Sequence, residues 1–294
     1  MKSSQPAGGA GMPYDGLYRG QRVALLTQHG KERVIAPVLD EALGCRVGRV
    51  TGYDTDRLGT FTRDIARAGT QLEAARAKAR IGMELSGLPL GLASEGAFGL
   101  DPFAGMLPWN VERLIFIDDL LDIEVTGTAQ AAANSAQLLA ASWGEVEKFA
   151  RASGFPEHHL VLRPEGENDM RIRKGLAGWP ELEAAYALAI CESPNKRVFV
   201  EVDLRAHANP TRLSTIRLAA VDLARRLSSR CPACSLPGFW LFESIPGLPC
   251  RACGVPTREV RAEIYGCLKC GHRVTRERAE REWADPGHCD GCNP

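Results

Sequence analysis

The sequence predicts an α/β domain, with a mixed sheet and helices on both of its faces, followed by a small zinc-binding domain. Two observations predict the first domain: strand-like and helix-like segments alternate from residue 22, and a polar strand end at 201–209 leads directly into a helix. A third observation predicts the second domain, because eight of the 10 cysteines fall between residues 231 and 292 as Cys-x-x-Cys pairs.

Length and composition set the expected domain organisation. The chain has 294 residues, 45% of them hydrophobic, and a formal net charge of zero, which allows a large core and gives no sign of a nucleic-acid partner. No apolar run reaches the roughly 20 residues that span a bilayer, and the N-terminus lacks a hydrophobic signal core, so we expect a cytoplasmic protein without membrane contact. The expected parts are a disordered tail at 1–18, an α/β domain at 19–229 and a zinc domain at 230–294.

The first elements form a strand–helix–strand unit, which is the usual opening of an α/β sheet. The helix in this unit is expected to end at Gly44, in the common C-terminal glycine position. In order, the expected elements are strand 22–27, helix 34–43, strand 46–51, loop 53–64, helix 70–86, strand 89–93 and a glycine-bounded turn at 94–99.

The later elements alternate in the same way. A second helix is expected to end at a glycine, here Gly154. The expected elements are a hairpin of strands 113–118 and 122–126, helix 134–153, strand 159–163, polar loop 164–174, helix 180–191, strand 197–205 and helix 211–229.

The stretch from 201 to 212 predicts a site. Its alternation of polar and apolar residues is typical of a strand with one buried face, and Asn209-Pro210 is typical of a helix start. Unpaired backbone N–H groups and the positive end of the helix dipole would attract an anion there. The alternative is a half-exposed edge strand with solvated charges. The residues that we select are Asp203, Arg205 and His207 as catalytic candidates, and Asn209, Thr211 and Arg212 as substrate-binding candidates, with Glu201 on the same face.

Three polar segments follow strands or begin helices in the N-terminal half, where open α/β sheets place their ligands. Thr27 and Lys31 offer a hydroxyl and an ammonium group to phosphate oxygens. Glu73 and Lys78 lie five residues apart on one helix, which alone would indicate an exposed helix face. Glu95, followed by Gly96, presents a carboxylate suited to a divalent cation or to the activation of a water molecule.

Together, these segments resemble the inosine-triphosphate pyrophosphatase and Maf-like family of nucleotide hydrolases, over about residues 20–130. That family has a Thr/Ser-x-Asn-x-x-Lys-like phosphate loop after its first strand, then a helix reading Glu-Asn-Ala-x-x-Lys-Ala, then a strand ending in an acidic, glycine-containing turn. The chain is similar at Thr27 and Lys31, at Glu73, Ala75, Lys78 and Ala79, and at Glu95 and Gly96.

The resemblance implies a fold and a set of roles. It implies an inosine-triphosphate-pyrophosphatase-like sheet, Lys31 as a phosphate ligand, Glu73 and Glu95 as Mg²⁺ ligands, and Lys78 as a group that neutralises a triphosphate. One of the carboxylates would orient the attacking water. The whole chain is also similar to a bacterial family of unknown function that pairs such an α/β region with C-terminal zinc knuckles, and this second resemblance implies no activity.

The C-terminal cysteines predict two structural zinc ions, because two Cys-x-x-Cys pairs complete one tetrahedral site with no open position. The order of the pairs leaves sequential, interleaved and nested sharing of the two ions open. Such a segment has few apolar residues and would hardly fold without metal. The eight predicted zinc ligands are Cys231, Cys234, Cys250, Cys253, Cys267, Cys270, Cys289 and Cys292.

The leading functional hypothesis is a Mg²⁺-dependent hydrolase of a nucleotide or another phosphorylated small molecule. The alternative is a non-enzymatic protein that senses a small anion and contacts a protein or nucleic-acid partner through its zinc ribbons. Residues 230–294 carry nearly balanced charge, so we expect a protein contact there more than a nucleic-acid contact. The prediction leaves room for a homodimer.

Overall fold

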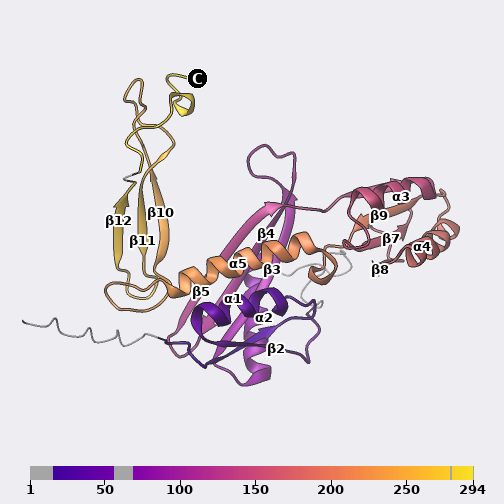
Figure 1. The fold of residues 1–294 in the computed structure, drawn as a ribbon, viewed down its shortest axis with the longest axis horizontal. Helices are drawn as coiled ribbons and strands as arrows, with labels where there is room; N and C mark the ends of the chain where they lie inside the picture. Colours follow the sequence, from indigo (N-terminus) through magenta and orange to yellow (C-terminus); the bar gives the residue numbers. More distant parts are fainter. Residues whose placement is uncertain (1–15, 56–68, 279, 294) are drawn as a thin grey trace, which may run out of the picture. The chain divides into compact units, whose positions relative to one another are not determined.

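The computed structural model describes residues 16–55, 69–278 and 280–293 (Figure 1). Residues 1–15 of the predicted N-terminal tail and most of the predicted loop at 53–64 therefore lie outside the described residues, whereas Tyr18, which was assigned to the disordered tail, is buried. The described residues divide into two compact units, one within residues 18–224 and one within residues 225–293, together with residues 16 and 17. No helix in the described part is long and apolar enough to cross a membrane.

A mixed five-stranded sheet forms the first half of the larger unit. Its strand order is β2-β1-β3-β4-β5, with β1 parallel to both of its neighbours and the last three strands antiparallel. Helices α1 and α2 connect the first three strands, which confirms the predicted strand–helix–strand opening. The elements are β1 (Arg22–Leu26), α1 (Glu32–Leu43), β2 (Arg46–Val50), α2 (Gln71–Ser86), β3 (Leu90–Leu100), β4 (Pro108–Asp118) and β5 (Ile123–Ala132).

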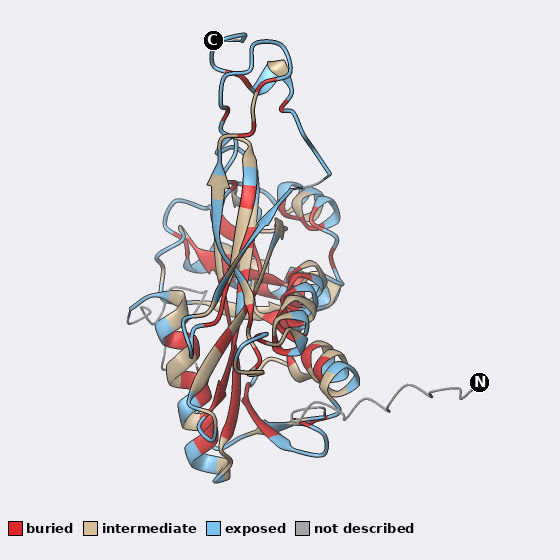
Figure 2. Ribbon diagram, turned by 90° about the vertical axis from the view of Figure 1, so that its left-hand side faces the viewer, coloured by how far each residue is buried: buried red, intermediate tan, exposed pale blue. Residues whose placement is uncertain are grey.

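Helices cover both faces of this sheet, whose strands carry most of the buried residues of the region (Figure 2). On one face, Ala79 and Met83 of α2 pack against Ile115. On the other face lies α5 (Pro210–Ser228), which follows so closely along β5 that a Cβ atom at Gly127 would lie 2.5 Å from the carbonyl oxygen of Ala219. The prediction of a mixed sheet with helices on both faces is thus confirmed.

The predicted turn at 94–99 is wrong. These residues form the second half of β3, which pairs with β4 along its whole length, from Leu90 opposite Asp118 to Leu100 opposite Pro108. The two glycines of this segment suggested a turn, but here they lie in a strand that is held by backbone pairing. Glu95 therefore lies inside a buried strand. The hairpin of β4 and β5 is confirmed and is longer than predicted.

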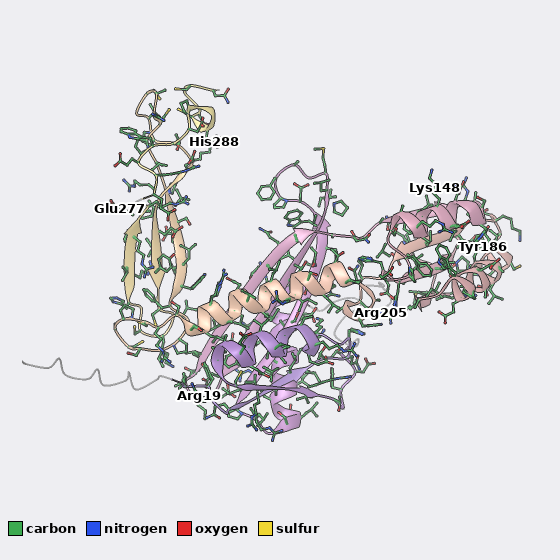
Figure 3. The ribbon with its side chains drawn as sticks, in the orientation of Figure 1. Arg19, Lys148, Tyr186, Arg205, Glu277 and His288 are labelled. Atoms are coloured by element: carbon green, nitrogen blue, oxygen red, sulfur yellow. The ribbon has the colours of Figure 1, made fainter. Side chains whose placement is uncertain are left out.

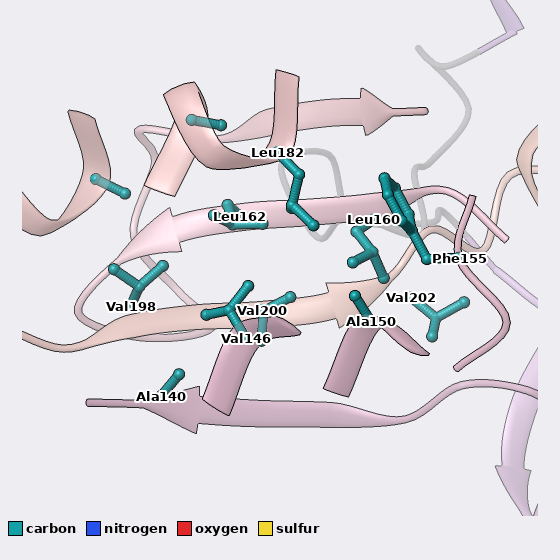
Figure 4. Close-up of a cluster of buried hydrophobic side chains, with 12 residues drawn as sticks. Ala140, Val146, Ala150, Phe155, Leu160, Leu162, Leu182, Val198, Val200 and Val202 are labelled. Atoms are coloured by element: carbon teal, nitrogen blue, oxygen red, sulfur yellow. The ribbon is translucent and has the colours of Figure 1, made fainter. Parts of the chain in front are cut away.

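A second, separate sheet follows in the larger unit, so the single sheet that we expected is wrong. Its four strands are all antiparallel, in the order β6-β9-β7-β8. Two helices cover one face, and aliphatic side chains of the strands fill the space below them (Figure 4). The elements are β6 (Gln137–Ala140), α3 (Trp143–Ala152), β7 (Leu160–Pro164), β8 (Arg173–Leu176), α4 (Trp179–Glu192) and β9 (Val198–Val202).

Two further predictions fail in this sheet. Residues 134–142 do not extend the helix that ends near Gly154; they contain β6, and Ser142 starts α3 by accepting a hydrogen bond from the Glu145 amide at 3.3 Å. The strand predicted at 197–205 ends at Val202. The Asp203 carboxylate accepts a hydrogen bond from the Arg205 amide at 3.0 Å, and this tight turn stops the strand.

The smaller unit contains a three-stranded antiparallel sheet of β10 (Trp240–Pro246), β11 (Val260–Gly266) and β12 (Arg273–Glu277), with β11 in the middle. Cysteine pairs precede β10 and follow β11 at one end of the sheet. The other two pairs lie in the β10–β11 connection and after β12, at the opposite end.

Candidate functional site

The sheet order creates a site-forming position at the carboxyl end of β1, beside the middle of β3. The chain leaves β1 toward β2 on one side and returns through α2 to β3 on the other, which makes this gap a topological switch point. The pairing of β1 with β3 ends near Leu25 and Leu92, and β3 continues beyond it. Open α/β sheets bind ligands in such crevices, and five of the buried charged residues of this unit lie near this position.

On the α2 face of the sheet, Glu95 forms an ion pair with Lys78. Both side chains are buried. The first turn of α2 is fixed next to them, because the Gln71 side chain donates hydrogen bonds to the carbonyl oxygens of Glu95 at 2.6 Å and Val111 at 2.9 Å. Two of the residues selected from the sequence are therefore brought together, although Glu95 is presented by a strand.

On the opposite face, Glu112 of β4 pairs with Arg212 of α5. Arg212 Nε donates to Glu112 Oε1 at 2.7 Å, and its Nη1 donates to the Leu204 carbonyl at 2.6 Å. The side chains are 1% and 0% exposed, and Asn110 also donates to Glu112 at 3.2 Å. Sequence reasoning missed Glu112. The available signal was a polar Asn-x-Glu step at 110–112, which period 2 places on one face of an otherwise apolar strand.

Gly96 makes this second ion pair sterically feasible. It lies directly opposite Glu112 in the β3–β4 register. A Cβ atom at Gly96 would lie 2.3 Å from Glu112 Oε1 and 2.6 Å from Arg212 Nη2. The sequence placed this glycine, a predicted substrate-binding residue, in a turn; in the structure it lies in β3 and leaves room for two charged side chains against the strand.

Lys31 connects the two ion pairs. It begins α1 directly after the β1 loop, is buried, and donates a hydrogen bond from Nζ to the Ser94 carbonyl at 2.7 Å. Burial, assisted by the positive charge of Arg212, lowers the pKa of Lys31 to about 8, while Glu95 and Glu112 act in the opposite direction. Lys31 therefore interacts electrostatically with both carboxylates. We call Lys31, Lys78, Glu95, Glu112 and Arg212 the charge cluster.

Glu73 does not belong with these buried residues. It is exposed, and its carboxylate accepts a hydrogen bond from the Thr70 amide at 2.7 Å while the Thr70 hydroxyl accepts one from the Glu73 amide. This reciprocal capping box lowers the pKa of Glu73. The structure thus separates the two carboxylates that were predicted to share a Mg²⁺ ion. Thr27 is buried at the end of β1, and its carbonyl accepts a hydrogen bond from Arg49 Nε at 3.1 Å.

The predicted single file of polar side chains at 201–209 is wrong, because the strand ends at Val202. Glu201 is buried beside Arg163, with 3.5 Å between the paired atoms. Asp203 is fully buried and pairs with Arg205, which Figure 3 labels in the loop after β9. His207 lies in a short 3₁₀ helix, is exposed, and stacks on the ring of His29, with 5.2 Å between ring centroids.

The start of α5 is confirmed at Asn209-Pro210. The Asn209 carboxamide accepts a hydrogen bond from the Arg212 amide at 2.9 Å and donates one to the Asn134 carbonyl at 3.1 Å. Thr211 contacts His158 at 2.9 Å. Among the candidates from this stretch, Arg212 is the one whose side chain reaches Glu112, and the buried helix start aims it there.

The cysteines form two clusters of four that share their pairs in an interleaved order. Cys231 and Cys234 join Cys267 and Cys270, whereas Cys250 and Cys253 join Cys289 and Cys292. The closest sulfur–sulfur distances between pairs are 3.6 and 3.7 Å in the first cluster and 3.6 and 3.9 Å in the second. A tetrahedral zinc ion with Zn–S bonds of about 2.3 Å places its sulfurs about 3.8 Å apart, whereas a disulfide holds them at about 2.05 Å. Each cluster can therefore hold one zinc ion.

Three of the four pairs repeat one knuckle geometry. The residue after the second cysteine has a left-handed backbone, at Ser235, Gly254 and Gly271, and its amide donates to the carbonyl of the first cysteine at 2.8, 2.8 and 3.0 Å. This turn directs both sulfur atoms of a pair toward the same cluster. Elsewhere in the described part of the chain, no group of three or more His, Cys, Asp or Glu side chains is placed to hold a metal.

A protein-family model, described as a domain of unknown function (DUF6671), matches residues 78–294. This is most of the chain, so the chain belongs to that family. The matched region includes the eight paired cysteines and, within the charge cluster, Lys78, Glu95, Glu112 and Arg212; it begins after Lys31. No curated protein and no solved structure matches the chain.

Proposed function

We propose that this member of the DUF6671 family is a hydrolase that cleaves a phosphate group from a nucleotide or another phosphorylated small molecule at the charge cluster. The observation that carries the proposal is the composition of this cluster: three cationic side chains and two carboxylates, all buried, near the carboxyl end of β1, where the pairing of β1 with β3 ends. Buried charges are costly to fold around, and their concentration at a switch point favours a functional role over a structural one.

The excess of cations specifies an anionic ligand. At neutral pH, Lys31, Lys78 and Arg212 outnumber the two carboxylates by one charge, and a phosphate group would balance the surplus. Arg212 offers a planar fork that suits phosphate oxygens, and the lysines act as point charges. The lowered pKa of Lys31 fits a buried cation whose charge is not fully balanced, because a bound anion would raise this pKa again.

The carboxylates supply the remaining chemistry. We assign to Glu95 the role of general base: it accepts a proton from a water molecule while the water oxygen bonds to phosphorus and the phosphate leaving group departs. Glu95 and Glu112 lie on opposite faces of β3 and β4, so each would give a Mg²⁺ ion one ligand at most. Such an ion would take its other ligands from substrate phosphates and water, and it would neutralise charge on the phosphates.

The test is release of phosphate and pyrophosphate from a panel of ordinary, deaminated and oxidised nucleoside triphosphates with Mg²⁺. We expect Glu95→Gln to lower kcat/KM by about 100-fold or more, because general-base catalysis contributes about that much. Glu73→Gln is the matched control, since it makes the same chemical change on the exposed start of α2 and should leave kcat/KM within a few-fold of wild type.

Two results would overturn the hydrolase assignment. One is the absence of release from every triphosphate by a folded, zinc-loaded protein. The other is equal activity of wild type and Glu95→Gln. If triphosphates raise the thermal stability of the protein without turnover, the cluster is instead a sensing site, which is the binding-protein alternative.

A further inference from the structure

Aromatic and arginine side chains alternate on one face of the three-stranded sheet in the smaller unit. Trp240 and Phe242 both belong to β10, and their positions relative to Gly266 of β11 place them on the same face of the sheet. Trp240 lies opposite Gly266 in the register, and the space above Gly266 is filled by Phe242, whose ring atoms would lie 3.4 Å from a Cβ atom there. A bulge between Leu241 and Glu243 adds an extra residue to the strand at Phe242.

An arginine guanidinium group lies over each of these two rings. The Arg273 Cζ atom lies 4.1 Å from the centre of the Phe242 ring, and the Arg226 Cζ atom lies 5.4 Å from that of Trp240. Phe242 is 49% exposed, and Arg273 is exposed and lies opposite Gly266 on β12. We call Arg226, Trp240, Phe242 and Arg273 the stacking face.

We propose that the stacking face binds single-stranded nucleic acid. Flat rings and guanidinium planes stack on unpaired bases of any sequence, and the arginines add positive charge for the phosphate backbone. The nearly balanced total charge of the unit is compatible with this local group of arginines, because charged residues elsewhere in the unit pair with one another. Glu259 pairs with Arg281 and His288, and Asp290 pairs with Arg258.

The same arrangement argues against duplex nucleic acid. A duplex is held mainly through many phosphate contacts, which require a wide basic surface, whereas the stacking face has two arginines. Its aromatic rings could not stack on the bases of a duplex, because the faces of those bases are already stacked on one another. A single strand with a shallow salt dependence is the ligand that fits two aromatic rings and two cations.

The experiment measures binding of fluorescein-labelled oligo-dT and oligo-U, each about 12 nucleotides long, to the full-length, zinc-loaded protein by fluorescence anisotropy. We expect binding of at least one of them, with a slope of log K against log salt of about −1.4, the value for release of counterions by two cations on a single strand. The comparison of the two oligomers shows whether DNA or RNA is preferred.

Variants tie the binding to these residues. Phe242→Ala should weaken it by about tenfold or more, as loss of one stacked base does. Arg273→Lys keeps the charge and loses the planar group, so it should weaken binding less than Arg273→Ala. The matched controls are Phe103→Ala, which removes an 82% exposed ring from the larger unit, and Arg258→Ala, which removes an exposed arginine already paired with Asp290; both should bind like wild type.

The proposal is overturned if neither oligonucleotide binds at low salt, or if binding is the same in Phe242→Ala, Arg273→Ala and wild type. Zinc content and circular dichroism of each variant establish that it is folded. If Phe242→Ala does not fold, the oligonucleotide binding of the surface variant Arg273→Ala alone decides whether the proposal holds. Failure here is distinct from failure of the proposed hydrolysis, which depends on residues of the other unit.

Discussion

Gly96 and Gly99 lie three residues apart on β3 and have opposite surroundings. At Gly96 a side chain would collide with the buried Glu112–Arg212 pair, whereas at Gly99 a Cβ atom would meet no other atom within 4 Å. The two glycines look alike in the sequence. The difference between them arises from β4 and α5, which contribute residues that are remote along the chain.

We predict that Gly96→Ala lowers the free energy of unfolding by about 3 kcal/mol or more, because it overpacks the strand and forces two buried charges apart. Gly99→Ala is the matched control, and we expect its effect to be within about 1 kcal/mol of zero. Urea denaturation measures both. Equal midpoints and slopes for the two variants would contradict the assigned role of Gly96.

Lys31 gives the protein a defined pH response. Its folded pKa of about 8 lies below the ordinary value of 10.5. Between these two pH values the unfolded lysine binds a proton that the folded lysine has released, so the stability of the wild type rises with pH there. Below pH 8 both states are protonated, and the cost of burying the charge is fully present.

We therefore predict that Lys31→Met removes this pH dependence. As the pH rises from 8 to 10.5, the free energy of unfolding of the wild type should increase relative to that of Lys31→Met. Urea denaturation of both proteins at several pH values measures this change. A difference that stays constant with pH would show that Lys31 keeps an ordinary pKa.

At the scale of elements, the Glu112–Arg212 pair connects β4 to the start of α5. We predict that Glu112→Gln costs about 3–5 kcal/mol of stability, because it leaves a buried guanidinium without its counter-charge. Glu124→Gln is the control: it weakens the partly exposed pair of Glu124 with Arg76 and should cost less than about 1 kcal/mol. Thermal and urea unfolding of both variants would show the difference. Similar losses would contradict a special role for the buried pair.

Local signals account for the elements that the sequence predicted correctly. The strand–helix–strand opening has regular periodicity and a left-handed Gly44 at its helix end, and the start of α5 has its asparagine cap. The prediction of the turn at 94–99 failed because contacts between segments that are distant along the chain determine the structure there. Glycines near Glu95 suggested a turn because the pairing of β3 with β4 is invisible in either segment alone. The alternation at 201–209 suggested a strand throughout, but the hydrogen bond that the Arg205 amide donates to the Asp203 carboxylate ends the strand at Val202.

The candidate site was predictable only in part, for the same reason. Lys31, Lys78 and Glu95 were selected from segments that follow strands or lie on the packed face of α2. Glu73 was selected with them, but its capping bond turns it to the surface. Glu112 was missed because the polar step from Asn110 to Glu112 does not reveal its partner, Arg212, which comes from the far end of the larger unit.

At the scale of the whole molecule, the interleaved cysteine clusters make the second half of the smaller unit dependent on the first. Each cluster joins one pair that precedes β11 to one that follows it. We predict that a chelator strong enough to remove both zinc ions unfolds this sheet, because metal binding is coupled to folding in such small units. Sequential pairing would instead have produced two independent metal-bound loops.

The pairing itself can be tested by zinc content. We predict that the double variant Cys231→Ser/Cys267→Ser retains one zinc ion per chain, because both cysteines belong to the same cluster. Under sequential pairing the same variant would damage both sites and retain none. Cys231→Ser/Cys250→Ser gives the reverse expectation, and elemental analysis of purified proteins separates the two arrangements.

The most direct measurement of the central claim is binding of Mg²⁺–nucleoside triphosphates by titration calorimetry, with wild type, Lys31→Met and Lys148→Met compared at neutral pH. Lys148 is an exposed lysine of α3 (Figure 3), so its variant controls for loss of one positive charge. If the charge cluster holds phosphate, wild type and Lys148→Met bind alike and Lys31→Met binds at least tenfold more weakly. Equal binding by all three proteins, or binding by none, would contradict a phosphate site at the charge cluster.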